Sequence, residues 1–98
     1  MGELTISLEE GFARDRVVIR SDGATAYDAS DLTTQTQTGL AGVARVQVAG
    51  EAQLEISLPS RGLTQVLQLN ASITPYVRVS IVGDQIELIS TDQAPYYA

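Results

Sequence analysis

The feature that most constrains this chain is a period-two alternation of apolar and polar residues, which recurs along most of its length. At the N-terminus, Leu4, Ile6 and Leu8 are separated by Thr5 and Ser7. Successive side chains of a β-strand point to opposite faces, so this alternation predicts strands with one buried face. No apolar i, i+3, i+4, i+7 pattern persists over three helical turns, so no helix is predicted.

The sequence Asp22-Gly23 predicts a hairpin with a two-residue turn, because primed turns favour residues that tolerate a positive φ. The flanking residues 16–21 and 24–29 carry apolar side chains on both faces, so the alternation does not fix which face is buried. An uninterrupted register beyond the turn gives the pairs Ser21 with Ala24, Arg20 with Thr25, Ile19 with Ala26, Val18 with Tyr27 and Val17 with Asp28.

A turn at Gly83-Asp84 predicts a second hairpin, between residues 76–81 and 86–89. This register places apolar residues opposite one another on one face and polar or charged residues mainly on the other. The expected pairs are Val79 with Leu88, Ile81 with Ile86, Arg78 with Ile89 and Ser80 with Glu87.

Residues 44–48 and 53–58 alternate in the same way, but a two-residue loop between them would set Val48 opposite Gln53. A one-residue change of register moves every side chain to the other face of a strand. We therefore expect either an odd-length loop or bulge, or two strands that belong to different sheets. The turn at 59–62 leads into a further strand that begins at Leu63.

The segment around Thr34, Thr36 and Thr38 alternates threonine with glutamine and would be polar on both faces of a strand. Such a segment is typical of an exposed edge strand or a long polar loop. If it is extended, its free backbone groups are available to pair with a second chain. Tyr96 and Tyr97 follow a proline and offer aromatic contact area. These five residues form the predicted interaction surface.

The composition removes most catalytic chemistry, because Cys, His, Trp and Lys are all absent. No disulfide, thiolate nucleophile, imidazole base, Schiff base or zinc site of the usual kind is available. Six arginines against twelve acidic residues give a net charge of -6, which disfavours nucleic acid and anionic membranes as partners. We expect no enzyme and no cofactor.

Five acidic residues supply oxygen atoms of the kind that Ca²⁺ prefers. Their spacing is not that of an EF-hand loop, and adjacent glutamates point to opposite faces of a strand. A calcium- or carbohydrate-binding module is therefore the alternative function, although the absence of Trp counts against a sugar platform. The acidic residues are Glu9, Glu10, Asp22, Asp28 and Asp31.

Seven or eight short strands separated by Gly or Pro turns predict an all-β fold. We expect one domain over residues 1–98, an antiparallel sandwich of immunoglobulin- or fibronectin-like architecture, with a small closed barrel as the alternative. Residues 93–98 are expected to form a C-terminal tail. A cytoplasmic location is the default expectation, because no signal peptide, membrane span or lipidation motif is found. The predicted function is a non-catalytic interaction module that binds another protein or itself, for example as a homodimer.

Overall fold

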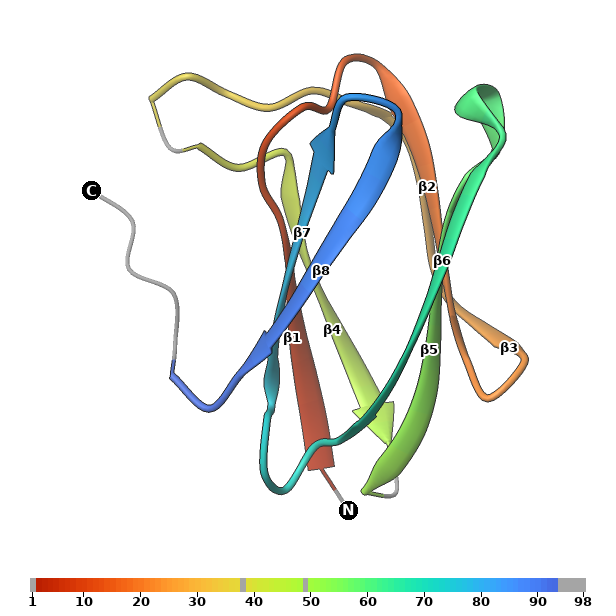
Figure 1. Cartoon of the computed structure of the whole chain (residues 1–98), viewed down its shortest axis with the longest axis vertical. Coiled ribbons are helices and arrows are strands. Elements are labelled where there is room, and N and C mark those ends of the chain that lie inside the picture. Colours follow the sequence, from red (N-terminus) through yellow and green to blue (C-terminus); the bar gives the residue numbers. More distant parts are fainter. Residues whose placement is uncertain (1, 38, 49, 94–98) are drawn as a thin grey trace.

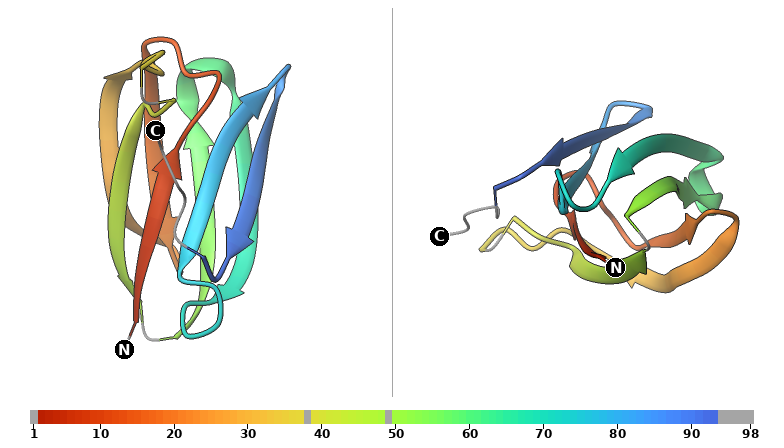
Figure 2. Two further views of the ribbon diagram at one scale, coloured as in Figure 1. Left: turned by 90° about the vertical axis from the view of Figure 1, so that its left-hand side faces the viewer. Right: turned by 90° about the horizontal axis from the view of Figure 1, so that it is seen from below.

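The computed structural model describes residues 2–37, 39–48 and 50–93. In these residues the chain forms eight strands and one short 3-10 turn, arranged as two sheets packed face to face (Figures 1 and 2). No helix in this part of the chain is long and apolar enough to cross a membrane. The elements are β1 (Gly2–Leu8), β2 (Asp15–Ser21), β3 (Ala24–Leu32), β4 (Gly42–Val48), β5 (Glu51–Leu58), η1 (Pro59–Arg61), β6 (Leu63–Asn70), β7 (Tyr76–Val82) and β8 (Gln85–Thr91).

Each sheet contains four strands, in the orders β4-β1-β7-β8 and β3-β2-β5-β6. The two-sheet β-sandwich predicted from the sequence is confirmed, and the sheets do not close into a barrel. All pairings are antiparallel except that of β1 with β7, which is parallel. At one side of the sandwich the edge strands β6 and β8 lie close together, and the Gln65 side chain donates a 3.4 Å hydrogen bond to the Ile86 carbonyl (Figure 2).

The core lies between the two sheets and is built from the apolar residues of the period-two pattern. Its members are buried because each strand directs alternate side chains inward. Phe12, which lies in the β1–β2 loop, joins them with 3% of its surface exposed. The side chains with no more than 1% exposure are those of Leu4, Ile6, Leu8, Val17, Ile19, Leu54, Ile56, Leu58, Val77 and Val79.

The two predicted hairpins differ in how well their registers were anticipated. All four expected pairs between β7 and β8 are confirmed. Between β2 and β3, the pairs next to the Asp22-Gly23 turn are confirmed, but a bulge shifts the rest by one residue. Ile19 therefore pairs with Tyr27 and Val18 with Asp28, and the uninterrupted register was wrong beyond Arg20. The bulge places both Ile19 and the partly buried Tyr27 against the core.

β4 and β5 belong to different sheets, which is one of the two arrangements expected from their alternating patterns. β4 pairs with β1 in the first sheet, whereas β5 pairs with β2 and β6 in the second. Val48 and Gln53 are thus not cross-strand neighbours, and each strand directs its own apolar residues into the core. The turn at 59–62 forms η1, and Gly62 ends it with φ +66°.

Candidate functional site

The outer face of the second sheet is polar, because the same alternation that fills the core turns hydrophilic residues outward. On β5, Glu51 and Gln53 point away from the core, and the β5–β6 register places Asn70 and Gln68 opposite them. Val66 is the exception on β6, with 46% of its surface exposed. This face is therefore a surface rich in amides and carboxylates.

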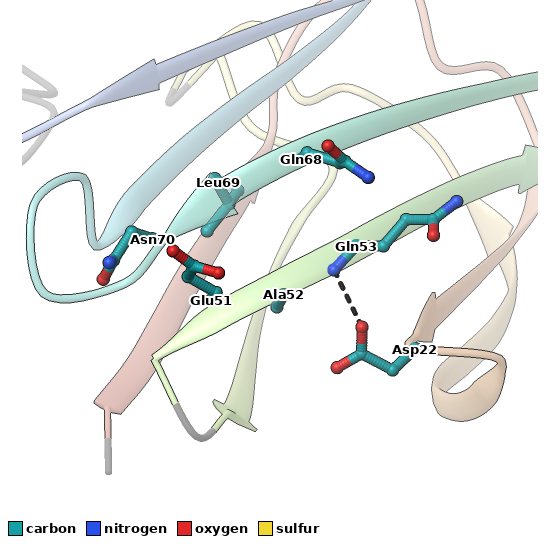
Figure 3. A pocket seen from close by; sticks show the side chains of 7 residues that line it. All are labelled: Asp22, Glu51, Ala52, Gln53, Gln68, Leu69 and Asn70. Atoms are coloured by element: carbon teal, nitrogen blue, oxygen red, sulfur yellow. Dashed lines mark hydrogen bonds between the residues drawn. The ribbon is translucent and has the colours of Figure 1, made fainter.

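Three hollows lie along this face and share lining residues. The largest, about 510 Å³, is at the lower end of the sandwich in Figure 1 (Figure 3). It shares Gln53 with a hollow of about 190 Å³, which in turn shares Arg20 with a hollow of about 370 Å³ near Pro59. We call this series the trough. Its lower hollow is lined by Asp22, Glu51, Ala52, Gln53, Gln68, Leu69 and Asn70.

The lower hollow lies between two turns whose backbones are held by hydrogen bonds, the β2–β3 turn and the turn after β6. The Asp22 carboxylate accepts a 3.0 Å hydrogen bond from the Gln53 amide, and the Asp22 amide donates to the Gln53 carbonyl at 2.9 Å (Figure 3). The Asn70 side-chain oxygen accepts a 2.9 Å bond from the Ser72 amide and so shapes the turn after β6. These contacts hold the β2–β3 turn and the end of β6 on either side of β5.

Three side chains of the lower hollow are not used by the fold. The Glu51 carboxylate and the carboxamides of Gln53 and Gln68 form no hydrogen bond or ion pair with the residues that the structure describes. All three residues are exposed. Their hydrogen-bonding capacity is therefore available to a ligand.

Farther along the trough, arginines are paired with acids. Arg16 holds Asp28 through two bonds of 3.0 and 2.8 Å, and this hydrogen bonding lowers the pKa of the Asp28 carboxyl. The same contact raises the pKa of Arg16. Arg20 lies 3.5 Å from Glu55. Both pairs are substantially exposed, so each contributes little to stability and mainly sets the local charge.

At the opposite end of the sandwich, ionic contacts serve the fold. Arg61 of η1 binds the Asp15 carboxylate through bonds of 2.8 and 2.9 Å and also donates to the Gly11 carbonyl at 3.1 Å. The Arg61 hydrogen bonds hold the pKa of Asp15 below its usual value, against the opposing effect of burial. The pKa of Arg61 is raised by the same contact. Arg78 similarly donates to the buried Glu9 at 2.9 Å.

Two of the threonines predicted to form an interaction surface, Thr34 and Thr36, lie in a loop and not in a strand. β3 ends at Leu32, and the described residues between it and β4 form no strand. Thr34 is used internally: its hydroxyl donates to the Glu9 carbonyl at 2.6 Å and accepts from the Phe12 amide at 3.1 Å. The extended alternative was wrong here because these bonds, and a turn closed by Gln35, hold the backbone in a loop.

Of the four remaining predicted site residues, the structure describes one. Thr36 is exposed in a turn. Thr38, Tyr96 and Tyr97 lie outside the described residues.

The acidic residues considered for calcium are dispersed. Asp22 contacts the β5 backbone, Asp28 binds Arg16, and Asp31 lies 3.7 Å from Arg14. Residues 2–37, 39–48 and 50–93 contain no group of three or more acidic side chains that could hold a metal ion. The geometry therefore gives the calcium hypothesis no support.

The sequence did not predict the trough, although one pair of its residues could have been placed opposite each other from the sequence. A turn at 59–62 was expected, and from it the pairing of Leu58 with Leu63 sets Gln53 opposite Gln68. The approach of the Asp22 turn to β5 has no comparable local signal. No family model, curated protein or solved structure matches this chain.

Proposed function

We propose that this protein is a non-catalytic interaction module that binds another protein through the trough on the outer face of the second sheet. The observation that carries this proposal is the set of uncommitted polar side chains, Glu51, Gln53 and Gln68, in the largest of the three hollows of the trough. They stand on neighbouring paired strands, so the scaffold sets the positions of their backbones before a partner arrives.

A carbohydrate is the second candidate ligand, because carboxylates and carboxamides also bind sugar hydroxyls. No aromatic residue lines any of the three hollows of the trough. Sugar rings are commonly held against aromatic faces, so the lining favours a polypeptide. The exposed Val66 adds a small apolar contact suited to a side chain of a partner.

The proposal is tested by selecting random heptapeptides displayed on phage against the protein. The selected peptides are then measured against Gln53→Trp, which fills the trough, and against Gln47→Trp on the outer face of the first sheet. Gln47 is also an exposed strand glutamine, so it is a matched control. We expect Gln53→Trp to abolish binding and Gln47→Trp to leave it unchanged. Peptides that bind both variants like the wild type would contradict the proposal.

An interaction module can also bind a second copy of itself. The mass of the protein in solution distinguishes such a dimer from a monomer that binds another protein. We expect a monomer at tens of micromolar for the wild type. The measurement is repeated with Thr36→Lys and with a chain that ends at Ala94. A dimer that dissociates with either change would instead assign the contact to the Thr36 loop or to the segment that contains Tyr96 and Tyr97.

A further inference from the structure

Charge is distributed unevenly along the trough. Its lower hollow contains two carboxylates, those of Asp22 and Glu51, and no arginine is among its lining residues. Farther along, Arg20 and Arg16 already hold the carboxylates of Glu55 and Asp28. The carboxylates of the lower hollow are therefore not compensated by an arginine, whereas those farther along the trough are. The chain as a whole carries a net charge of -6.

The lower hollow offers hydrogen-bond acceptors that match a cationic side chain. Figure 3 shows Glu51, Gln53 and Gln68 on adjacent strands around the same opening. The Glu51 carboxylate accepts bonds only, and each glutamine adds a carbonyl oxygen. A guanidinium presents five N–H donors and no acceptor, so it satisfies several of these oxygens at once.

The length of the trough suits an extended segment. β5 and β6 pair from Glu51 opposite Asn70 to Leu58 opposite Leu63. Eight residues of strand span about 24 Å, which is the length of about seven or eight extended residues. Val66 lies midway along β6 and is exposed on this face.

We infer that the trough takes an extended peptide segment of another protein, with an arginine side chain of that segment in the lower hollow beside Glu51 and Asp22. This inference rests on the proposed function and specifies its partner. The balanced upper part of the trough accepts neutral polar residues, and acidic segments are rejected by the net charge of the chain.

The test uses four acetylated, amidated heptapeptides of alternating serine and threonine with a central valine. Two carry arginine at the first or at the last position, and two carry citrulline there. Citrulline has nearly the shape of arginine but no charge. Each peptide is titrated into the ¹⁵N-labelled protein at low and at high ionic strength, and amide shifts are recorded. Maltohexaose and cellohexaose are titrated in parallel.

We expect one arginine peptide to shift the resonances of Gln53, Gln68 and Glu51, with about fivefold or greater loss of affinity when citrulline replaces arginine. High salt should weaken the arginine peptide and not the citrulline peptide. Glu51→Gln should reduce arginine-peptide affinity about fivefold, whereas Glu87→Gln, an exposed charge change on the other sheet, should not alter it. The citrulline comparison is independent of whether any variant folds.

Four outcomes would overturn the inference. Equal affinity of the arginine and citrulline peptides would show that the trough binds peptides without recognising the positive charge of arginine. Amide shifts confined to the first sheet, or no binding of any peptide, would show that the trough is not a peptide-binding site. Binding of an oligosaccharide to the same residues without binding of arginine peptides assigns the trough to carbohydrate. Phage-selected peptides that lack basic residues but require an open trough would preserve the proposed function alone.

Discussion

The two ends of this sandwich use their polar residues differently. At the upper end in Figure 1, the 9–14 loop is tied to β7, to η1 and to the 33–41 loop by the Glu9, Glu10, Gly11 and Phe12 backbones. At the lower end, backbone hydrogen bonds such as that from Asp22 to Gln53 also tie the loops to the strands, but the side chains of Glu51, Gln53 and Gln68 make no hydrogen bond or ion pair with the described residues.

This difference separates residues that stabilise the fold from residues that can bind. Asp15 at the upper end is 3% exposed, so its charge requires Arg61. Glu51 at the lower end is exposed and can remain charged without a partner. We therefore expect substitutions at the upper end to change the free energy of unfolding, and substitutions of Glu51, Gln53 or Gln68 in the lower hollow to change binding only.

The largest effect is expected at Gly11. Its φ is +89°, and a Cβ atom there would lie 2.3 Å from the Ile81 carbonyl oxygen. Gly11→Ala should cost about 3–5 kcal/mol, measured by denaturant unfolding. Gly83→Ala is the control, because Gly83 also has positive φ (+62°) but would meet no atom within 4 Å. That control should cost only about 1 kcal/mol. Equal losses would show that the close approach to Ile81 is not what Gly11 provides.

Removal of the guanidinium from the upper end should have the next largest effect. Arg61→Ala leaves the Asp15 carboxylate buried without its ionic partner, and should cost about 2–3 kcal/mol, less than a fully buried pair because the Arg61 side chain is 33% exposed. Arg45→Ala, at an exposed arginine with no ion pair in the described structure, should cost less than about 0.5 kcal/mol. A small change in the free energy of unfolding for both variants would show that the Arg61–Asp15 pair does not stabilise the upper end.

The same pair predicts the acid limb of the stability profile. The hydrogen bonds from Arg61 lower the pKa of Asp15 in the folded state, so the folded protein binds fewer protons than the unfolded chain. The stabilisation is complete above the unfolded pKa of about 4 and is lost as the pH falls through the lower, folded value. Stability should be nearly flat from about pH 6 to 9. Thermal unfolding of Asp15→Asn should show a shallower decline below pH 4 than the wild type.

A moderate effect is expected at Thr34. Thr34→Val removes both hydroxyl bonds and leaves the Phe12 amide without that acceptor, at a cost of about 1–2 kcal/mol. Thr36→Val, at an exposed turn position of the same loop, should be neutral within about 0.5 kcal/mol. Urea midpoints of the two variants provide the comparison, and identical midpoints would mean that the loop is not held by Thr34.

The smallest effect on stability is expected in the lower hollow. Glu51→Gln removes a charge that has no partner in the described structure, so the free energy of unfolding should change by no more than about 0.5 kcal/mol. The unfolding curve and the arginine-peptide titration are measured on the same preparation. A clear loss of stability would show that Glu51 serves the fold and would erase the contrast between the ends.

The sequence predicted elements better than it predicted registers. The β7–β8 register followed from alternation because one face, with Val79 and Ile81, is consistently buried. The β2–β3 register failed after Arg20 because both faces carry apolar residues, so alternation gave no sign of the bulge. For the candidate site, the pairing of Gln53 with Gln68 could have been derived from the turn at 59–62, but the trough could not.

Most of the β-strands, their inward stripes of Leu, Ile and Val outside the β2–β3 hairpin, the two hairpin turns and the scarcity of catalytic groups could be derived from the sequence, because each follows from a residue type or a spacing of a few positions. The sequence did not reveal that β4 and β5 belong to different sheets, that β1 and β7 run parallel, or that the Asp22 turn lies against β5 beside Glu51. Period two specifies which face of a strand is buried and carries no information about which distant strand lies beside it. That choice depends on the joint packing of both sheets, and the trough is one of its results.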